Sequence, residues 1–332
     1  MTQKILYIAN PRGFCAGVDR AISIVRLTLE QFGQPVFVHH EVVHNRFVIA
    51  ALQKQGAIFV ENLDEAPPQS VCIFSAHGVS RAVEQTAQAK SMRILDATCP
   101  LVKKVHLEVR RMHEAGFEII MIGHAGHPEV VGTMGQLTEH IYLIESIDDI
   151  ALLPVKHSQQ LAYVTQTTLA VQETQAIITA LKRKFPGIIG PRKSDICYAT
   201  QNRQNAAITL AKLSDIMVIV GSPNSSNSNR LKEVVEQAGT QAWMVDHADQ
   251  LNESWFEQVA HIGLTAGASA PESLVKTIAL RIQELTQATI QELAGVEEKV
   301  VFALPSTLQS KRADVALLNL GDMPSSGSCT QT

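Results

Sequence analysis

The sequence lacks the features that mark several large classes of protein. No apolar run approaches the roughly 20 residues that a membrane-spanning helix needs, and the first residues, MTQKILYIANPRG, do not have the layout of a signal peptide. Charged residues make up 18% of the chain and leave a net charge of −4, so no basic excess is available to neutralise the phosphates of nucleic acid. We therefore expect a cytoplasmic protein that binds neither nucleic acid nor membrane.

Cysteine is scarce as well. The chain has five cysteines and no CxxC pair, so the local spacing of a zinc ribbon is absent. An odd number of widely separated cysteines in a chain without a secretory signal does not favour a disulfide framework. Any metal site must therefore be assembled by tertiary structure, from among Cys15, Cys72, Cys99, Cys197 and Cys329.

What the sequence does contain is an alternation of short β-branched runs with amphipathic helical patterns. Val102, Val105, Val109 and Met112, for example, lie on one face of a helix. This alternation predicts βαβ units and parallel sheets. The candidate strands are 4–9, 35–40, 57–60, 71–76, 93–97, 117–123, 141–145, 161–166, 216–221, 242–246, 261–267 and 300–304.

A loose internal repeat organises these elements. Cys15, Cys99 and Cys197 each follow an extended segment and precede a helical pattern, and the intervals of 84 and 98 residues each suit one small α/β unit. We predict an α/β protein of three similar modules with small parallel sheets around a central site. The predicted modules are 15–97, 98–196 and 197–290, with strands 4–9 and 300–304 added to one of them and 306–332 as a tail.

The three repeated cysteines are the first candidates for chemistry. Three thiolates that face one central space suit a soft metal or an iron–sulfur cluster, and a helix N-terminus favours the thiolate. The alternative is that they are small buried residues without a ligand. Cys72 lies in an apolar strand and is expected in the core, and Cys329 falls in the tail.

Turns rich in Gly, His and Ser follow several strands, at 74–80, 122–130, 220–230 and 264–273. Such turns hold phosphate with backbone N–H groups and hydroxyls, which needs no basic patch. Ser225, Ser226 and Asn227 precede a helix and fit this role, although a plain helix-capping loop is an equal alternative. The GxGxxG and P-loop signatures occur at none of these turns, which disfavours those nucleotide-binding folds.

Titratable and hydroxyl side chains occur in the same turns. His44, His77 and His127 can hydrogen-bond phosphate oxygens, although a single histidine is more often structural. Glu129 could deliver protons, or it could be an ordinary first-turn residue of a helix. Thr167 offers a hydroxyl at a strand end, or a simple N-cap.

Taken together, the motifs resemble those of the 4-hydroxy-3-methylbut-2-enyl diphosphate reductase family, also called LytB or IspH. Nine motifs occur in order over roughly residues 3–305. They are NPRGFCAGVDRAI (10–22), HEVVHNR (40–46), FSAHGVS (74–80), DATCPLV (96–102), GHAGHPEV (123–130), TQTT (165–168), DICYAT (195–200), GSPNSSNSNRL (221–231) and TAGASAPE (265–272).

The resemblance implies one [4Fe-4S] cluster held by Cys15, Cys99 and Cys197, with one iron lacking a protein ligand. It implies that Glu129 donates protons and that Thr167 orients both the substrate and this glutamate. The residues implied to bind substrate are His44, His77, His127, Thr167, Ser225, Ser226, Asn227 and Ser269.

The implied reaction is the reductive dehydroxylation of (E)-4-hydroxy-3-methylbut-2-enyl diphosphate to isopentenyl and dimethylallyl diphosphates, the last step of the methylerythritol phosphate route to isoprenoids. An electron donor such as flavodoxin or ferredoxin is implied too. Two alternatives from other classes are a non-catalytic iron–sulfur sensor and a zinc hydrolase that uses the three cysteines and Glu129. The sensor gives no reason for Glu129 or the Ser/Asn loop, and the hydrolase predicts a colourless protein with one zinc.

Overall fold

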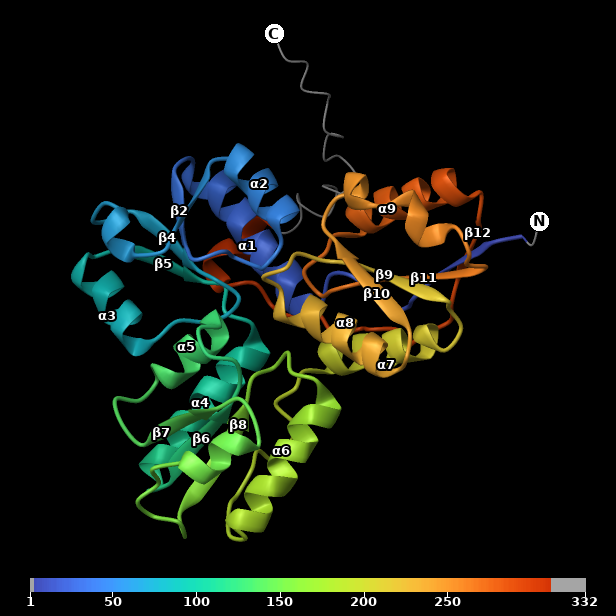
Figure 1. Ribbon diagram of the computed structural model, residues 1–332. Helices are drawn as coiled ribbons and strands as arrows, with labels where there is room; N and C mark the ends of the chain where they lie inside the picture. Colours follow the sequence, from blue (N-terminus) through green and yellow to red (C-terminus); the bar gives the residue numbers. More distant parts are fainter. Residues whose placement is uncertain (1–2, 312–332) are drawn as a thin grey trace.

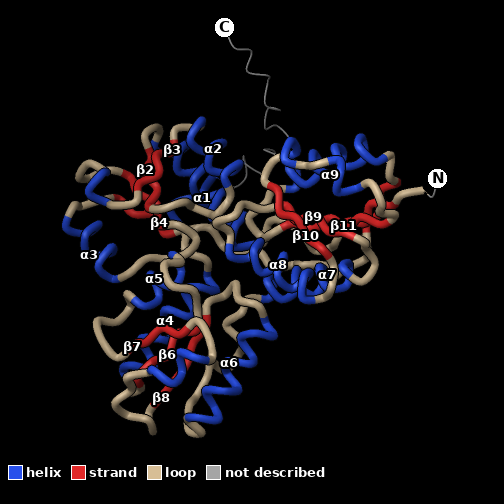
Figure 2. Tube along the Cα trace, in the orientation of Figure 1, coloured by secondary structure: helices blue, strands red, loops and turns tan. Residues whose placement is uncertain are grey.

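The structure, a computed structural model, describes residues 3–311 of the chain. Its strands form three separate parallel sheets, each packed against its own helices, so that the molecule has three lobes (Figure 1). Figure 2 shows the three sheets as separate groups of strands that surround a loop-rich centre. The expected α/β class with three small parallel sheets is therefore confirmed.

The first sheet has the strand order β3-β2-β4-β5. Its core consists of apolar side chains such as Val36, Val38 and Ile73, which pack against one face of α1. The elements of this lobe are α1 (Ala16–Phe32), β2 (Val36–His39), α2 (Arg46–Lys54), β3 (Ala57–Val60), η1 (Leu63–Glu65), β4 (Val71–Phe74), α3 (Arg81–Ala89) and β5 (Arg93–Asp96).

The second sheet has the order β7-β6-β8. Every residue of the central strand β6 and of the edge strand β8 is buried, as expected of parallel strands whose two faces are both covered. The elements are α4 (Pro100–Glu114), β6 (Glu118–Ile122), α5 (Pro128–Met134), β7 (Ile141–Ile144), η2 (Asp148–Leu152), β8 (Leu161–Thr165) and α6 (Val171–Lys184).

The third sheet has the order β10-β9-β11-β1-β12, so the N-terminal strand joins the C-terminal lobe. In Figure 1 this strand lies among the orange elements. The elements are β1 (Ile5–Ile8), α7 (Tyr198–Ala211), β9 (Ile216–Val220), α8 (Ser226–Gln237), β10 (Gln241–Val245), η3 (Ala248–Gln250), η4 (Glu253–Phe256), β11 (His261–Ala266), α9 (Glu272–Thr286) and β12 (Thr289–Glu292). The last element, η5 (Ser306–Lys311), packs instead against α1 of the first lobe.

One predicted strand is wrong. Residues 300–304 form no strand; the edge position beside β1 is taken by β12, whose Thr289 pairs with Ile5. The segment instead passes over the first lobe, where Leu304 packs against the core and the Ala303 carbonyl accepts a hydrogen bond from Arg20. Within the predicted tail, 306–311 form a 3-10 helix, and 312–332 lie outside the described residues. We retain the boundaries 15–97, 98–196 and 197–290 as a proposal for the modules.

The parallel topology brings functional loops together. Apart from Cys197, which lies between α6 and α7, the candidate residues are carried by turns that follow β1, β2, β4, β5, β6, β8, β9 and β11, all at the carboxyl ends of their strands. In open α/β sheets, ligands bind outside these ends, because the loops there are free to vary and helix N-termini point toward them. In the part of the chain that the structure describes, no helix is long and apolar enough to span a membrane.

Candidate active site

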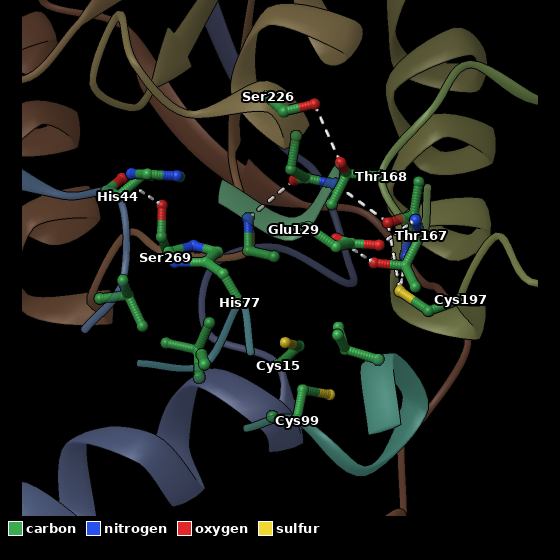
Figure 3. A pocket seen from close by; sticks show the side chains of 18 of the residues that line it. Cys15, His44, His77, Cys99, Glu129, Thr167, Thr168, Cys197, Ser226 and Ser269 are labelled. Atoms are coloured by element: carbon green, nitrogen blue, oxygen red, sulfur yellow. Dashed lines mark hydrogen bonds between the residues drawn. The ribbon is translucent and has the colours of Figure 1, made fainter. Parts of the chain in front are cut away.

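A cavity of about 110 Å³ lies where loops of the three lobes meet. Figure 3 shows how side chains from separate elements point into it. The structure brings together every site residue that the sequence predicted: Cys15, His44, His77, Cys99, His127, Glu129, Thr167, Cys197, Ser225, Ser226, Asn227 and Ser269 all line this cavity.

The three thiols occupy one end of the cavity. Cys15, Cys99 and Cys197 are the N-cap residues of α1, α4 and α7, so each begins a helix whose dipole favours a thiolate. Gly17 leaves room between two of the sulfurs, because a Cβ on this residue would lie 2.7 Å from Cys99 Sγ and 3.8 Å from Cys15 Sγ. Figure 3 shows the sulfurs facing a common space.

The electrostatics of these thiols disfavour the thiolate form unless a cation lies beside them. Burial, with repulsion from Cys15 as the next cause, raises the pKa of Cys99 to about 12 and that of Cys197 to about 11. Three thiolates without a cation are therefore unfavourable here, and bound iron would reverse the balance. Among the described residues, no three His, Cys, Asp or Glu side chains lie close enough to hold a single metal ion. Three cysteine thiolates are a donor set that an iron–sulfur cluster takes.

Arg203 of α7 fixes two of the cysteine-bearing segments relative to each other. This side chain is 1% exposed, and its guanidinium donates to the carbonyls of Gly13 at 2.9 Å and Phe14 at 3.0 Å, directly before Cys15. It also pairs with Glu298 at 3.0 Å. The guanidinium thereby links the loop of Cys15, the helix that begins at Cys197 and the C-terminal segment.

Three histidines line the cavity in a stacked group. The rings of His44 and His77 lie 4.1 Å apart and nearly parallel, and His127 meets both edge-on. Burial lowers the pKa of His127 to about 3 and moves the pKa of His77 well below its ordinary value, with repulsion from His44 as the next cause. Without a ligand these two rings are neutral, and an anion beside them would favour protonation.

Glu41 supports this group and was missed at the sequence level. Its Oε2 lies 3.1 Å from His44 Nδ1 and accepts a 2.7 Å hydrogen bond from Asn224 in the third lobe. The hydrogen bond from His44 is the main cause that lowers the pKa of Glu41. The carboxylate holds a proton on Nδ1, and His44 Nε2, which is buried without a partner among the described residues, is left for a ligand. In the sequence, the spacing of three residues between Glu41 and His44 was the signal that could have predicted this contact.

Glu129 is a buried carboxyl at the wall of the cavity. It is 3% exposed and accepts hydrogen bonds from Thr167 N at 2.6 Å and Thr167 Oγ1 at 2.8 Å. Burial raises its pKa to about 7, although both hydrogen bonds act in the opposite direction. A carboxyl group with this pKa still carries a proton that it can donate at neutral pH. An ordinary surface glutamate carries that proton only in acid.

Uncharged donors line the rest of the cavity. Ser225 begins α8, and its hydroxyl lies 3.4 Å from that of Ser269. Ser226 hydrogen-bonds Thr168 at 2.9 Å, which ties the third lobe to the second. Asn227 accepts from the amide of Ala268 at 2.8 Å, so its side-chain nitrogen is oriented as a donor. Such hydroxyls and amides can hold an anion without a basic patch.

Two further observations concern cysteines and their neighbours. Cys72 is 0% exposed in β4 and packs in the core, as expected, whereas Cys329 lies outside the described residues.

Thr200 was missed by the sequence reasoning. Its backbone N–H and hydroxyl lie 3.4 Å and 3.2 Å from Cys197 Sγ, contacts that stabilise a thiolate.

Fold and site together define a class of protein: a three-lobed α/β enzyme with thiols, anion donors and a buried acid around one cavity. The sequence pattern described as "LytB protein" matches residues 6–283. The 4-hydroxy-3-methylbut-2-enyl diphosphate reductase of Chromobacterium violaceum is 57% identical over 92% of this chain and 98% of its own length. That of Acinetobacter baylyi is 56% identical over the same shares.

Solved structures agree with these relatives. The E-1-hydroxy-2-methyl-but-2-enyl-4-diphosphate reductase from Plasmodium falciparum superposes with a TM-score of 0.90 at 37% identity, over 93% of this chain and 98% of the other. A second structure, of the "terminal enzyme of the non-mevalonate pathway", has a TM-score of 0.61 at 30% identity over 86% of this chain and 100% of the other. This chain belongs to the LytB family, whose members are iron–sulfur enzymes.

Proposed function

We propose that this chain catalyses the reductive dehydroxylation of (E)-4-hydroxy-3-methylbut-2-enyl diphosphate to isopentenyl and dimethylallyl diphosphates. Because it belongs to the LytB family, the chain is an oxidoreductase of the isoprenoid pathway. The observation that carries the proposal is the cavity itself, in which three thiols, a buried carboxyl with a pKa of about 7 and a set of uncharged anion donors share one space. Neither the sensor nor the zinc hydrolase accounts for all three.

The cysteines Cys15, Cys99 and Cys197 would hold one [4Fe-4S] cluster with one iron lacking a protein ligand. When bound, such a cluster supplies electrons and a Lewis acid to the substrate. The protein contributes partly buried thiols at helix N-termini, with the backbone N–H of Thr200 donating to Cys197. These contacts stabilise the thiolate form that ligation requires.

The diphosphate is assigned to the polar half of the cavity. The hydroxyls of Ser225, Ser226 and Ser269 and the amide of Asn227 are neutral donors, and the rings of His44, His77 and His127 can donate through their N–H groups. This arrangement matches a ligand with several negative charges in a chain of net charge −4. Binding of the remote diphosphate also positions the reacting carbon. Part of the binding energy thereby lowers the activation barrier of the reaction.

Glu129 is assigned as the proton donor and Thr167 as the residue that orients both this carboxyl and the substrate. In the balanced reaction the allylic C–O bond breaks, two electrons and two protons enter, and one water leaves. One proton joins the hydroxyl oxygen and the other joins a carbon of the allylic unit. A carboxylic acid that is half-protonated near pH 7 is suited to the first transfer.

The two electrons require a reducing partner, for which we propose flavodoxin or ferredoxin. The cytoplasmic location expected from the N-terminal sequence stays a prediction. The small-molecule substrate and the reductase class follow from the family.

The proposal is tested on protein purified and loaded under anaerobic conditions. We expect about four irons and four sulfides per chain, a broad visible absorption, and formation of both products from the allylic diphosphate with a chemical reductant. One zinc per chain, or a full cluster without any turnover of this substrate, would refute the proposal. The first result would favour the hydrolase and the second the sensor.

A further inference from the structure

A second groove, of about 540 Å³, lies outside the cavity and shares one wall with it. Thr98 and Pro100, the neighbours of Cys99, line this groove, while Cys99 itself lines the central cavity. The backbone of 98–100 therefore separates the groove from one of the three thiols. Arg20 reinforces this wall with a 3.1 Å hydrogen bond to the Thr98 carbonyl.

The surface around the groove carries an excess of positive charge. Lys103 and Lys104 line it, as does Leu107, which lies one turn further along α4 and is 54% exposed. Arg111 continues the same exposed stripe of the helix at the next turn. We define the α4 basic face as Arg20, Lys103, Lys104, Arg111, Arg192 and Lys193 around Leu107.

The loop of Arg192 and Lys193 belongs to this face because Lys104 Nζ donates to the Lys193 carbonyl at 3.1 Å. Both loop residues are exposed. The carboxylates that pair with the face are fewer and mostly buried. Lys104 pairs with Asp195, which is 0% exposed, and Arg111 with Glu108, which is 10% exposed; only the partner of Lys103, Asp96, reaches solvent appreciably, at 36%.

A cationic rim around one exposed apolar side chain is the pattern of a transient docking site. The positive charges speed the approach of a negatively charged partner, and the leucine side chain supplies an apolar contact that loses its water when the partner binds. Because the chain as a whole has a net charge of −4, this positively charged face is where an acidic partner is attracted, while the acidic remainder of the surface repels it. Its position behind Cys99 matters as well, because electron transfer slows steeply with distance and the intervening wall is a single backbone segment.

We propose that the α4 basic face docks a small acidic electron-transfer protein, which passes electrons inward past the 98–100 segment. This inference rests on the proposed function, since it requires a redox-active group at the three thiols. It assigns the face of the molecule at which reduction occurs, whereas substrate enters the central cavity.

The test uses the loaded full-length protein and a reduced acidic flavodoxin as the probe. The variant Arg192→Glu/Lys193→Glu reverses two exposed charges that lie outside the central cavity, and Leu107→Asp alters the centre of the face. The matched control is Lys182→Glu/Arg183→Glu, which reverses two exposed charges on α6. Oxidation of flavodoxin is followed by stopped flow without substrate, so that the rate reports docking whether or not turnover occurs.

We expect the second-order rate constant to fall about tenfold or more in both groove variants at an ionic strength of about 0.05 M. For the charge reversal, the difference should shrink at about 0.5 M salt, and the control should match the parent protein. Reduction by photoreduced 5-deazariboflavin, which is small and uncharged, should be unchanged in all of them, which shows that the metal centre is intact.

Equal flavodoxin rates in groove and control variants would overturn the proposal. So would a change in the sedimentation of a groove variant by itself, because the face would then bind a second copy of the chain. Failure of the parent protein to form product with deazariboflavin, with normal flavodoxin oxidation, would instead refute the proposed substrate and leave the docking face supported.

Discussion

Replacing Glu129 by glutamine is the substitution that probes the proposed chemistry most directly. The variant Glu129→Gln keeps the size of the side chain and can still accept the hydrogen bond from Thr167 N, so the pocket should keep its shape. It removes the only proton that the carboxyl can give up. We expect kcat to fall by about 10² to 10⁴-fold, the usual loss for a general acid, with unchanged iron content and unchanged affinity for the diphosphate.

The raised pKa also predicts a pH dependence of stability. A rise from the ordinary value of 4.5 to about 7 corresponds to roughly 3 kcal/mol. Below pH 4.5 the carboxyl is protonated in both folded and unfolded chains and costs nothing. Between pH 4.5 and about 7 the unfolded chain ionises while the folded one stays protonated, so stability is lost across this range, and the loss is complete above about pH 7. Glutamine does not ionise and escapes this loss.

Urea unfolding of the metal-free proteins measures this effect. The stability of Glu129→Gln relative to the parent should be greater at pH 8 than at pH 5 by roughly 2.5 kcal/mol, because a small part of the loss has already occurred at pH 5. In the active enzyme, kcat of the parent should decrease as the pH rises through about 7, and this decrease should be absent in the variant. An equal stability difference at both pH values, or near-normal turnover by the glutamine variant with a full cluster, would refute the role of this residue.

Three further substitutions test other parts of the site. Cys99→Ser should lower the iron content after anaerobic loading, whereas Cys72→Ala, in the core, should not; full iron in the first variant would remove that cysteine from the ligand set. Glu41→Gln should weaken the binding of inorganic pyrophosphate about tenfold by calorimetry, because His44 loses a charged hydrogen-bond partner, and an unchanged affinity would contradict this. Arg203→Leu should lower the free energy of unfolding by about 3 kcal/mol in urea, since it removes the cation from a partly buried carboxylate and the donors from two backbone carbonyls; a loss below about 1 kcal/mol would show that the pair is not structural.

The sequence by itself determined the local structure and the candidate residues. Eleven of the twelve predicted strands form, because each is a short apolar run bounded by turn residues, a signal that neighbouring residues carry. The cysteine motifs stand at helix starts as expected, since the N-cap position is set by the residues around it. The motif resemblance gave the family and the assignment of roles.

Only the tertiary structure decided how these parts meet. Residues 300–304 have the composition of a strand, but β12 occupies the free edge beside β1, and an edge accepts one partner. Glu41 gains its importance from Asn224, which lies 183 residues away along the chain. The pKa of Glu129 depends on its burial in the folded chain, which no local pattern encodes. Sequence patterns report neighbours along the chain, whereas a site is made by neighbours in space.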